Sequence, residues 1–282
     1  MVIMLTGTDT LAENQLEKVR RKVRKDSPAA PDSSADRGTH CKRCGHSPCC
    51  CDHEHDGFFS AAFGDLIGET ILFAVASPGW VPHRLLADDL KNLADFPAYP
   101  YADGLPGSLV INGFDIPNIS PWVGQFTAEA GSDFSDVDRI GGRLQLDTSS
   151  RFGIDTEFNV LNEGLGGATD SLWLGDINLT YRFAQSEAWQ FRAGFGANWL
   201  ADDDQTDGGV NVTYHIDVYP VRPWVIKTGI DYGTLGHTNR FHYRGTFGIQ
   251  LQEFELFTGY DYQHIASQDF HMMISGMAIW FH

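Results

Sequence analysis

The chain has 282 residues, 42 % of them hydrophobic, and a formal net charge of −17 at pH 7. The acidic balance argues against nucleic-acid binding, which requires basic patches. No apolar run approaches the roughly 20 residues that a membrane-spanning helix needs. The length suits one large domain or two small ones.

Residues 1–56 have the composition of a disordered tail. A basic run occupies residues 18–25, and the Pro-, Ala-, Ser- and Asp-rich stretch 27–37 cannot bury a core. The apolar stretch 1–5 is too short for the central region of a signal peptide. We therefore expect export because of the barrel described below, and not because of a recognisable leader.

All five cysteines lie between residues 41 and 51, within a Cys/His tract. Cys41 and Cys44 form a CxxC half-site, and His46, Cys49 and either His53 or His55 follow. These ligand types and spacings could hold zinc, and apart from zinc at this tract we expect no cofactor. The alternative is a metal-avid or oxidisable tail with no folded site.

Residues 57–121 form a second segment with helical spacing and Pro/Gly breaks. Apolar residues near helical spacing predict two short amphipathic helices between residues 58 and 96, and Pro97 marks the end of the second. An irregular connector continues to Pro121. It could cap a barrel mouth or lie at a membrane interface; the alternative is a loosely packed linker.

Residues 122–282 alternate apolar and polar side chains in runs of about ten, which is typical of strands with one wet face. The pattern predicts an all-β, antiparallel, up-and-down transmembrane β-barrel of about ten strands (8–10). Alternately long and short connections predict loops at one end and tight turns at the other. The candidate strands are 122–131, 139–147, 151–160, 172–183, 189–199, 209–219, 224–232, 240–250, 254–263 and 271–281.

The fifth candidate strand shows which face meets lipid. Trp189, Phe195 and Trp199 share one face, whereas Arg192 and Asn198 share the other. The two tryptophans are ten residues apart, which is roughly 25 Å along the membrane normal at a rise of about 3.3 Å and a tilt near 40°. Tryptophans at both interfaces are typical of a membrane barrel. In the last strand, Ser275 favours odd positions inward, which predicts that Trp280 faces lipid.

The opposite face carries charges that must pair or meet water inside a narrow barrel. We expect a polar, ion-paired lumen and no wide channel. The candidates for these lumen ion pairs are Arg182, Arg192, Asp217, Lys227, Arg244 and Asp261. The alternative is a soluble ligand-binding barrel of the lipocalin kind, in which the apolar face would point inward.

Catalytic motifs are weak. His264 and Ser267 lie near the predicted outer rim, as does the stretch 236–239, but no clear triad accompanies them. The acidic loop 202–208 could bind Ca²⁺, although it lacks the spacing of an EF-hand and a solvated loop is the alternative. We therefore predict no enzymatic activity, and an outer-membrane lipid hydrolase is retained as an alternative.

In its alternation, aromatic girdles and aromatic end Ile279-Trp280-Phe281, the segment 122–282 resembles small outer-membrane β-barrel proteins of the general OmpA and OmpX type. The resemblance implies location in the outer membrane, contact with outer-membrane lipid, and insertion by the barrel assembly machinery. That machinery commonly reads a terminal phenylalanine, whereas this chain ends Phe281-His282. The resemblance implies a structural or surface-interaction role, and neither it nor the residues indicate a ligand.

Overall fold

The structure is a computed structural model that describes residues 14–24, 77–86, 88, 93–111, 118–165 and 168–282. The zinc candidates Cys41, Cys44, His46 and Cys49 lie outside the described residues. So do the first predicted amphipathic helix and most of the tail 1–56. Among the residues that are described, no helix is both long and apolar enough to cross a membrane.

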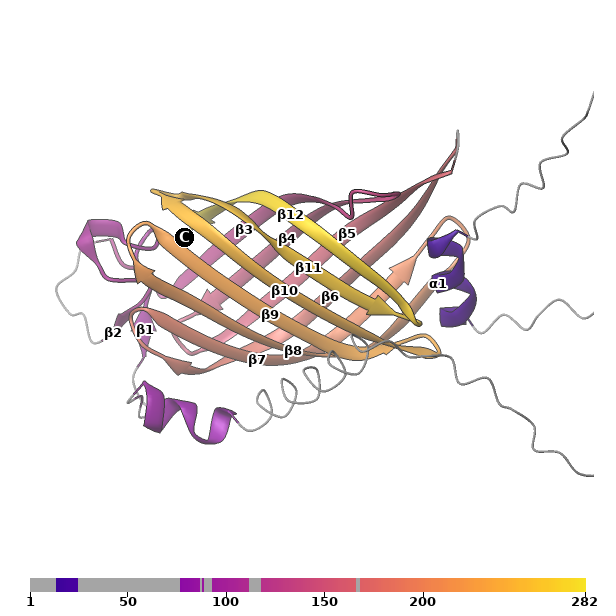
Figure 1. Ribbon diagram of the computed structural model, residues 1–282. Coiled ribbons are helices and arrows are strands. Elements are labelled where there is room, and N and C mark those ends of the chain that lie inside the picture. The colour runs from indigo at the N-terminus through magenta and orange to yellow at the C-terminus, as the bar shows by residue number, and fades with distance from the viewer. Residues whose placement is uncertain (1–13, 25–76, 87, 89–92, 112–117, 166–167) are drawn as a thin grey trace, which may run out of the picture. The chain divides into compact units, whose positions relative to one another are not determined.

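Residues 122–281 form a closed barrel of ten strands, each antiparallel to its neighbours, with β12 returning to pair with β3 (Figure 1). This confirms the predicted fold class and strand number. The strands are β3 (Trp122–Ser132), β4 (Val137–Thr148), β5 (Phe152–Leu165), β6 (Ala168–Gln185), β7 (Trp189–Ala201), β8 (Thr206–Val221), β9 (Trp224–Leu235), β10 (Thr238–Leu251), β11 (Phe254–Ile265) and β12 (Gln268–Phe281).

The predicted alternation of long and short connections is wrong, because the strands continue into the stretches expected to be loops. The loop predicted over 161–171 is instead the end of a hairpin, in which Asn162 pairs with Ser171 and Glu163 with Asp170. Extending the strands beyond the apolar band gives the backbone N–H and C=O groups there hydrogen-bond partners in the neighbouring strand. We call the end with the β5–β6, β7–β8 and β9–β10 turns the far end, and the end that holds Trp122 and the C-terminus the near end.

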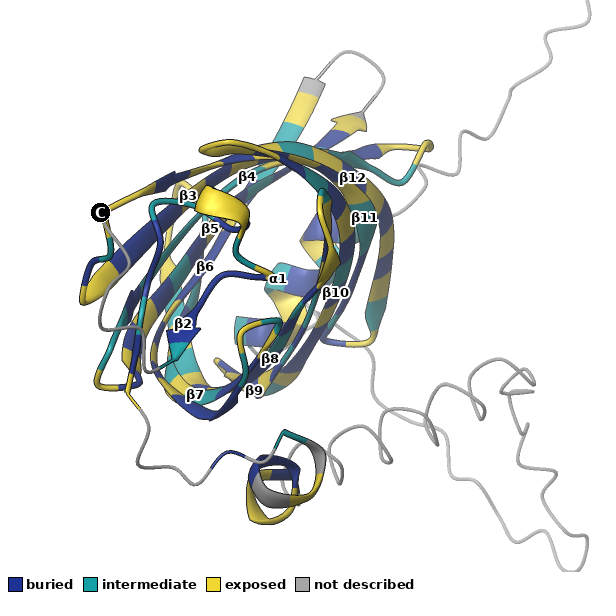
Figure 2. Cartoon of the chain, turned by 90° about the vertical axis from the view of Figure 1, so that its left-hand side faces the viewer, coloured by how far each residue is buried: buried dark blue, intermediate teal, exposed yellow. Residues whose placement is uncertain are grey.

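Side chains on the two faces of the barrel differ as the alternation predicts. In β7, Phe195 is 67 % exposed on the outside whereas Arg192 is 2 % exposed in the interior. Large apolar residues cover the exterior. Exposed and buried residues alternate along much of the barrel wall, most regularly in β12 (Figure 2). A soluble barrel of the lipocalin kind has the opposite sidedness and does not describe this chain.

The last strand has the opposite phase to the one predicted. Trp280 is 6 % exposed and points into the barrel with Ile274 and Ala278, while Ser275 is outside and donates a hydrogen bond to Thr258. Both faces of β12 are largely apolar, so its periodicity does not fix its orientation. The inward phase is favoured because the Trp280 indole packs against Phe96, Leu109 and neighbouring residues.

The N-terminal basic run is a helix, so disorder is the wrong description for this part of the tail 1–56. Helix α1 (Gln15–Arg24) buries Leu16, Val19 and Val23 at the far end of the barrel (Figure 1). A ten-residue helix is marginal in water by itself. Contacts with distant strands, which local composition does not reveal, stabilise it.

The connector before the barrel folds into short pieces. Its elements are the helical turns η1 (Ser77–Gly79), η2 (Val81–Leu85) and η3 (Ala102–Gly104), and the two-stranded sheet of β1 (Ala94–Asp95) and β2 (Val110–Ile111). Most of the second predicted helix lies outside the described residues; on either side of it, η2 ends at Leu85 and β1 begins at Ala94. β2 lies across the near opening of the barrel (Figure 2).

Candidate functional site

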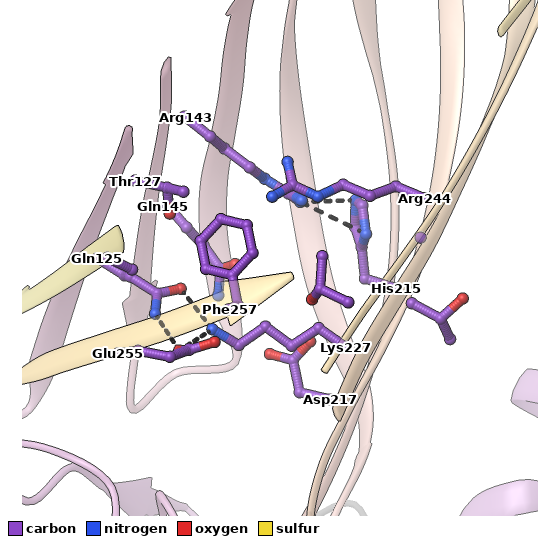
Figure 3. A pocket seen from close by; sticks show the side chains of 14 residues that line it. Gln125, Thr127, Arg143, Gln145, His215, Asp217, Lys227, Arg244, Glu255 and Phe257 are labelled. Carbon is purple, nitrogen blue, oxygen red and sulfur yellow. Dashed lines mark hydrogen bonds and ion pairs between the residues drawn. The ribbon is translucent and has the colours of Figure 1, made fainter. Parts of the chain in front are cut away.

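The lumen is the part of the molecule where the sequence places charged side chains and the structure assembles them. The inward positions of nine strands, from β3 to β11, supply its charged groups because alternate residues of a strand face the same side. Figure 3 shows part of it, with Arg143, Lys227 and Arg244 converging from three strands.

The layer nearer the far end is centred on Arg139. Its guanidinium is 2.5 Å from the Asp261 carboxylate and 3.3 Å from that of Glu157, and it also binds Glu129. Arg244 donates two hydrogen bonds to the same Glu129 carboxylate. Each charge is therefore held by more than one partner, which offsets the cost of taking it out of water.

The next layer pairs Arg143 with Asp155. The two side chains form a bidentate pair with N–O distances of 2.7 and 2.6 Å. His215 Nε2 lies 3.1 Å from the same Asp155 carboxylate, and Thr213 lies 2.7 Å from that ring nitrogen. Bidentate guanidinium–carboxylate pairs fix orientation as well as charge.

The layer closest to the near end contains the basic groups Arg182, Arg192 and Lys227. Arg192 binds Asp217 and lies 3.0 Å from Asp147. Lys227 Nζ lies 2.6 Å from the Glu255 carboxylate and donates to Gln125 at 3.0 Å (Figure 3).

The connector closes the near end over this layer. The guanidinium of Arg182 lies 5.0 Å from the Phe96 ring centroid, and the Lys227 ammonium lies 5.3 Å from that of Trp280. Both geometries are cation–π contacts. Phe96 belongs to the connector, whereas Trp280 belongs to β12 and packs against Phe96 and Leu109 of the connector. The connector therefore covers this layer, as a capping segment does and a loose linker does not.

Polar contacts fasten the connector to the barrel wall. Asp88 accepts two 2.8 Å hydrogen bonds from Arg151 in the β4–β5 turn. Tyr101 donates to the Trp224 carbonyl at 2.7 Å, and burial raises the pKa of Tyr101 to about 12. The phenol therefore stays protonated and keeps donating at neutral pH.

One cavity lies among these charges, lined by Gln125, Arg143, His215, Lys227, Arg244, Glu255 and neighbouring side chains (Figure 3). Its volume is about 30 Å³. A polar void needs at least ~10–15 Å³ to hold one water molecule. The cavity therefore has room for a few waters but not for an organic ligand.

All six sequence-predicted lumen residues face the interior. Arg192 and Asp217 pair with each other, and Arg244 and Asp261 are joined through Glu129 and Arg139. The partners of Lys227 and Arg182 are other residues, Glu255 at 2.6 Å and Asp147 at 3.8 Å respectively.

Several lumen residues were not among the predicted site residues, namely Arg139, Arg240, Glu129, Asp147, His215 and His242. The alternation did carry a signal for all of them except Glu129, because each of the others shares the face of a charged residue two to four positions away in its strand. Arg139 and Arg240 are the first residues of their predicted strands. At a strand end the apolar–polar alternation has neighbours on one side only, so it assigns the face less well there.

The predicted rim residues do not form a catalytic triad. His264 Nδ1 lies 2.7 Å from Asp269, but the Ser267 hydroxyl accepts a hydrogen bond from Lys22 instead. No hydrogen bond joins a serine hydroxyl to His264 in the part of the chain that the structure describes. In the acidic stretch 202–208, Asp202 binds Arg20 and Arg24 of α1, and Asp207 binds Arg24.

Comparisons with known proteins add little to this picture. No protein-family profile matches the chain, and no curated protein matches it. Among solved structures, the N-terminal β-barrel domain of Pseudomonas aeruginosa OprF is similar, at 12 % identity and a TM-score of 0.30, over 57 % of this chain and 98 % of that domain. A likeness of this degree assigns neither a family nor a function.

Proposed function

We propose that the chain is an integral outer-membrane β-barrel protein with a structural or surface-interaction role, and that it does not form a wide channel. The observation that carries this proposal is the sidedness of the barrel. Phe195 and other large apolar side chains cover the outside, while Arg139, Arg182 and Arg192 are fully enclosed.

Physical chemistry supports this environment. A soluble monomer rarely exposes a continuous apolar patch larger than about 300–600 Å², whereas here exposed apolar residues occur on every barrel strand. The closed sheet leaves no strand edge with unpaired backbone groups. The hydrocarbon interior of a bilayer requires this closure, because it offers no water to bind such groups. Exposed Trp122 and Trp224 at the near end, and Trp173 toward the far end, suit the two interfaces.

The same arrangement supports the absence of a wide channel. Ion pairs cross the lumen in successive layers, and the connector covers the near end. Among the residues that the structure describes, the cavity in the interior is water-sized, and this supports a closed lumen.

The proposed partners follow from this function. They are outer-membrane lipid around the barrel and the assembly machinery that inserts such barrels. Zinc binding by Cys41, Cys44, His46 and Cys49 stays a separate proposal that rests on the sequence. Chelation of zinc followed by circular dichroism and proteolysis of the tail would test it.

The experiment is refolding of the full chain with phospholipid vesicles, followed by flotation and gel electrophoresis with and without boiling. We expect the protein to float with the vesicles, to resist alkaline extraction, and to migrate differently when unheated. Planar bilayers containing it should show no large conductance steps. A chain that stays soluble without detergent would contradict membrane insertion, and porin-sized steps would contradict the closed lumen.

Localisation needs its own measurement. In a Gram-negative host that exports the chain, fractionation of the two membranes should place it in the outer membrane. Recovery from the inner membrane or the cytosol of cells that export a control barrel would contradict this part of the proposal.

A further inference from the structure

The far mouth of the barrel has an apolar lining that receives helix α1. Leu16, Val19 and Val23 are fully buried there. The lining comes from β4, β5, β6, β7, β9, the β11–β12 hairpin and β12, and consists of Val137, Leu161, Leu172, Leu174, Leu200, Leu235, Ile265, Ala266, Phe270, Met272 and Ile274. The three helix residues have the i, i+3, i+7 spacing by which an amphipathic helix binds an apolar groove.

Acidic side chains surround this lining and meet the basic face of α1. Arg20 forms a bidentate pair with Asp170, at 2.7 and 2.5 Å, and lies 2.8 Å from Asp202. Arg24 lies 2.8 Å from Asp202 and 3.1 Å from Asp207. These carboxylates come from two neighbouring hairpins, β5–β6 and β7–β8, so the mouth presents several complementary charges to α1 and not a single contact.

The barrel also satisfies backbone groups at both ends of the helix. The Glu163 carboxylate accepts hydrogen bonds from the Gln15 and Leu16 amides, each at 2.9 Å. At the other end, the His237 amide donates to the Val23 carbonyl at 2.9 Å. Terminal amides and carbonyls have no partner inside a helix, so the mouth recognises the helical conformation itself as well as its side chains.

Helix α1 is nevertheless not needed to build the barrel. The ten strands complete their hydrogen-bond ladder without it, and the charged layers lie beyond the apolar lining. A helix of ten residues is not stable alone. We therefore expect docking and folding of α1 to be one event, and expect the barrel to stay folded when α1 undocks.

From this geometry we propose that the far mouth is a binding site for a basic amphipathic helix, that α1 is its ligand in cis, and that α1 can be exchanged for another helix of the same kind. The proposal goes beyond the proposed function. It holds in detergent whether or not the barrel resides in the outer membrane.

Trypsin protection of the full chain in detergent micelles tests the site. α1 carries several cleavage positions, and cleavage after Lys22 can be followed by mass spectrometry. We expect Asp170→Lys to accelerate that cleavage about tenfold or more, since a charge-assisted contact is lost. Asp203→Lys makes the same charge change in an exposed loop residue and should leave the rate unchanged. Arg20→Glu combined with Asp170→Lys should restore protection. The cleavage rate of each folded variant is divided by the rate of the same variant after unfolding, which corrects for changes in the cleavage sequence.

Exchange is tested with a synthetic peptide of residues 14–25. Excess peptide should accelerate cleavage after Lys22 in the wild-type chain, and a peptide of the same composition in scrambled order should not. The folded state of each variant is checked by its unheated gel migration, and Val19→Asp, which removes an apolar contact, provides a second undocked variant.

Two results would overturn the proposal. The first is a wild-type cleavage rate equal to that of Val19→Asp, or no response to the peptide. The second is protection that falls as the protein is diluted, which would assign the bound helix to another copy of the chain and refute docking in cis.

Discussion

Nε2 of His242 lies 2.8 Å from Oδ2 of Asp261 in the middle of the lumen. The other ring nitrogen, Nδ1, lies 3.1 Å from the Asp231 carboxylate. A neutral imidazole has only one N–H, and ionised carboxylates only accept hydrogen bonds. The position therefore suits an imidazolium that joins β9, β10 and β11.

Replacing the His242 ring should remove a buried cation that pairs with the carboxylates of Asp231 and Asp261. We expect His242→Gln to lower the free energy of unfolding by about 3–5 kcal/mol, the usual cost of breaking a buried ion pair. Urea unfolding in micelles or vesicles measures it. His264→Gln removes an exposed rim pair and should change stability by about 0–1 kcal/mol. Equal effects of the two substitutions would contradict the role assigned to His242.

The orientation of the faces can be tested at the middle of β7. Phe195→Arg places a charge on the exterior near the centre of the apolar band and should cost about 2–4 kcal/mol of stability in a bilayer. Phe134, which is 80 % exposed in the β3–β4 turn, is the matched control. Phe134→Arg should have little effect, and a barrel that tolerates Phe195→Arg equally well in vesicles would show that lipid does not cover this face.

The pair of Arg192 and Asp217 separates charge pairing from packing. Either Arg192→Met or Asp217→Leu should destabilise the barrel by about 3–5 kcal/mol, because a buried charge loses one of its partners. The double substitution should recover part of that loss, since it removes both charges of this pair, while Asp147 still loses its contact with Arg192. A double-mutant cycle of urea unfolding measures the coupling. Strictly additive losses would mean that the two charges do not depend on each other.

Docking of α1 should depend on pH through Asp202 in the β7–β8 loop. The hydrogen bond from Arg24 holds the pKa of the Asp202 carboxyl well below its usual range. A carboxyl with a lowered pKa stabilises the docked state above the ordinary value of about 3.9 and loses that contribution as the pH falls below it. Hydrogen exchange of the α1 amides, corrected for intrinsic rates, should be slow at pH 6 and faster near pH 3. Asp202→Asn should flatten the response; an unchanged slope in this variant would assign the pH dependence to other groups.

The period of two in residues 122–281 determined the strand number, the antiparallel order and the inward face of most strands. Arg192, Asp217 and Arg244 were placed correctly because each lies inside a strand whose two faces differ strongly in polarity. That difference is local, so it can be read from neighbouring residues.

Partner choice and closure needed the tertiary structure. Arg240 meets Asp176 across the lumen at 3.2 Å, a pairing fixed by barrel closure and not by sequence separation. Trp280 turned inward because both faces of its strand are apolar, so contact with the connector decided its orientation. Helix α1 has too few residues to be stable alone, and the apolar lining and carboxylates that hold it come from strands more than a hundred residues away in the chain.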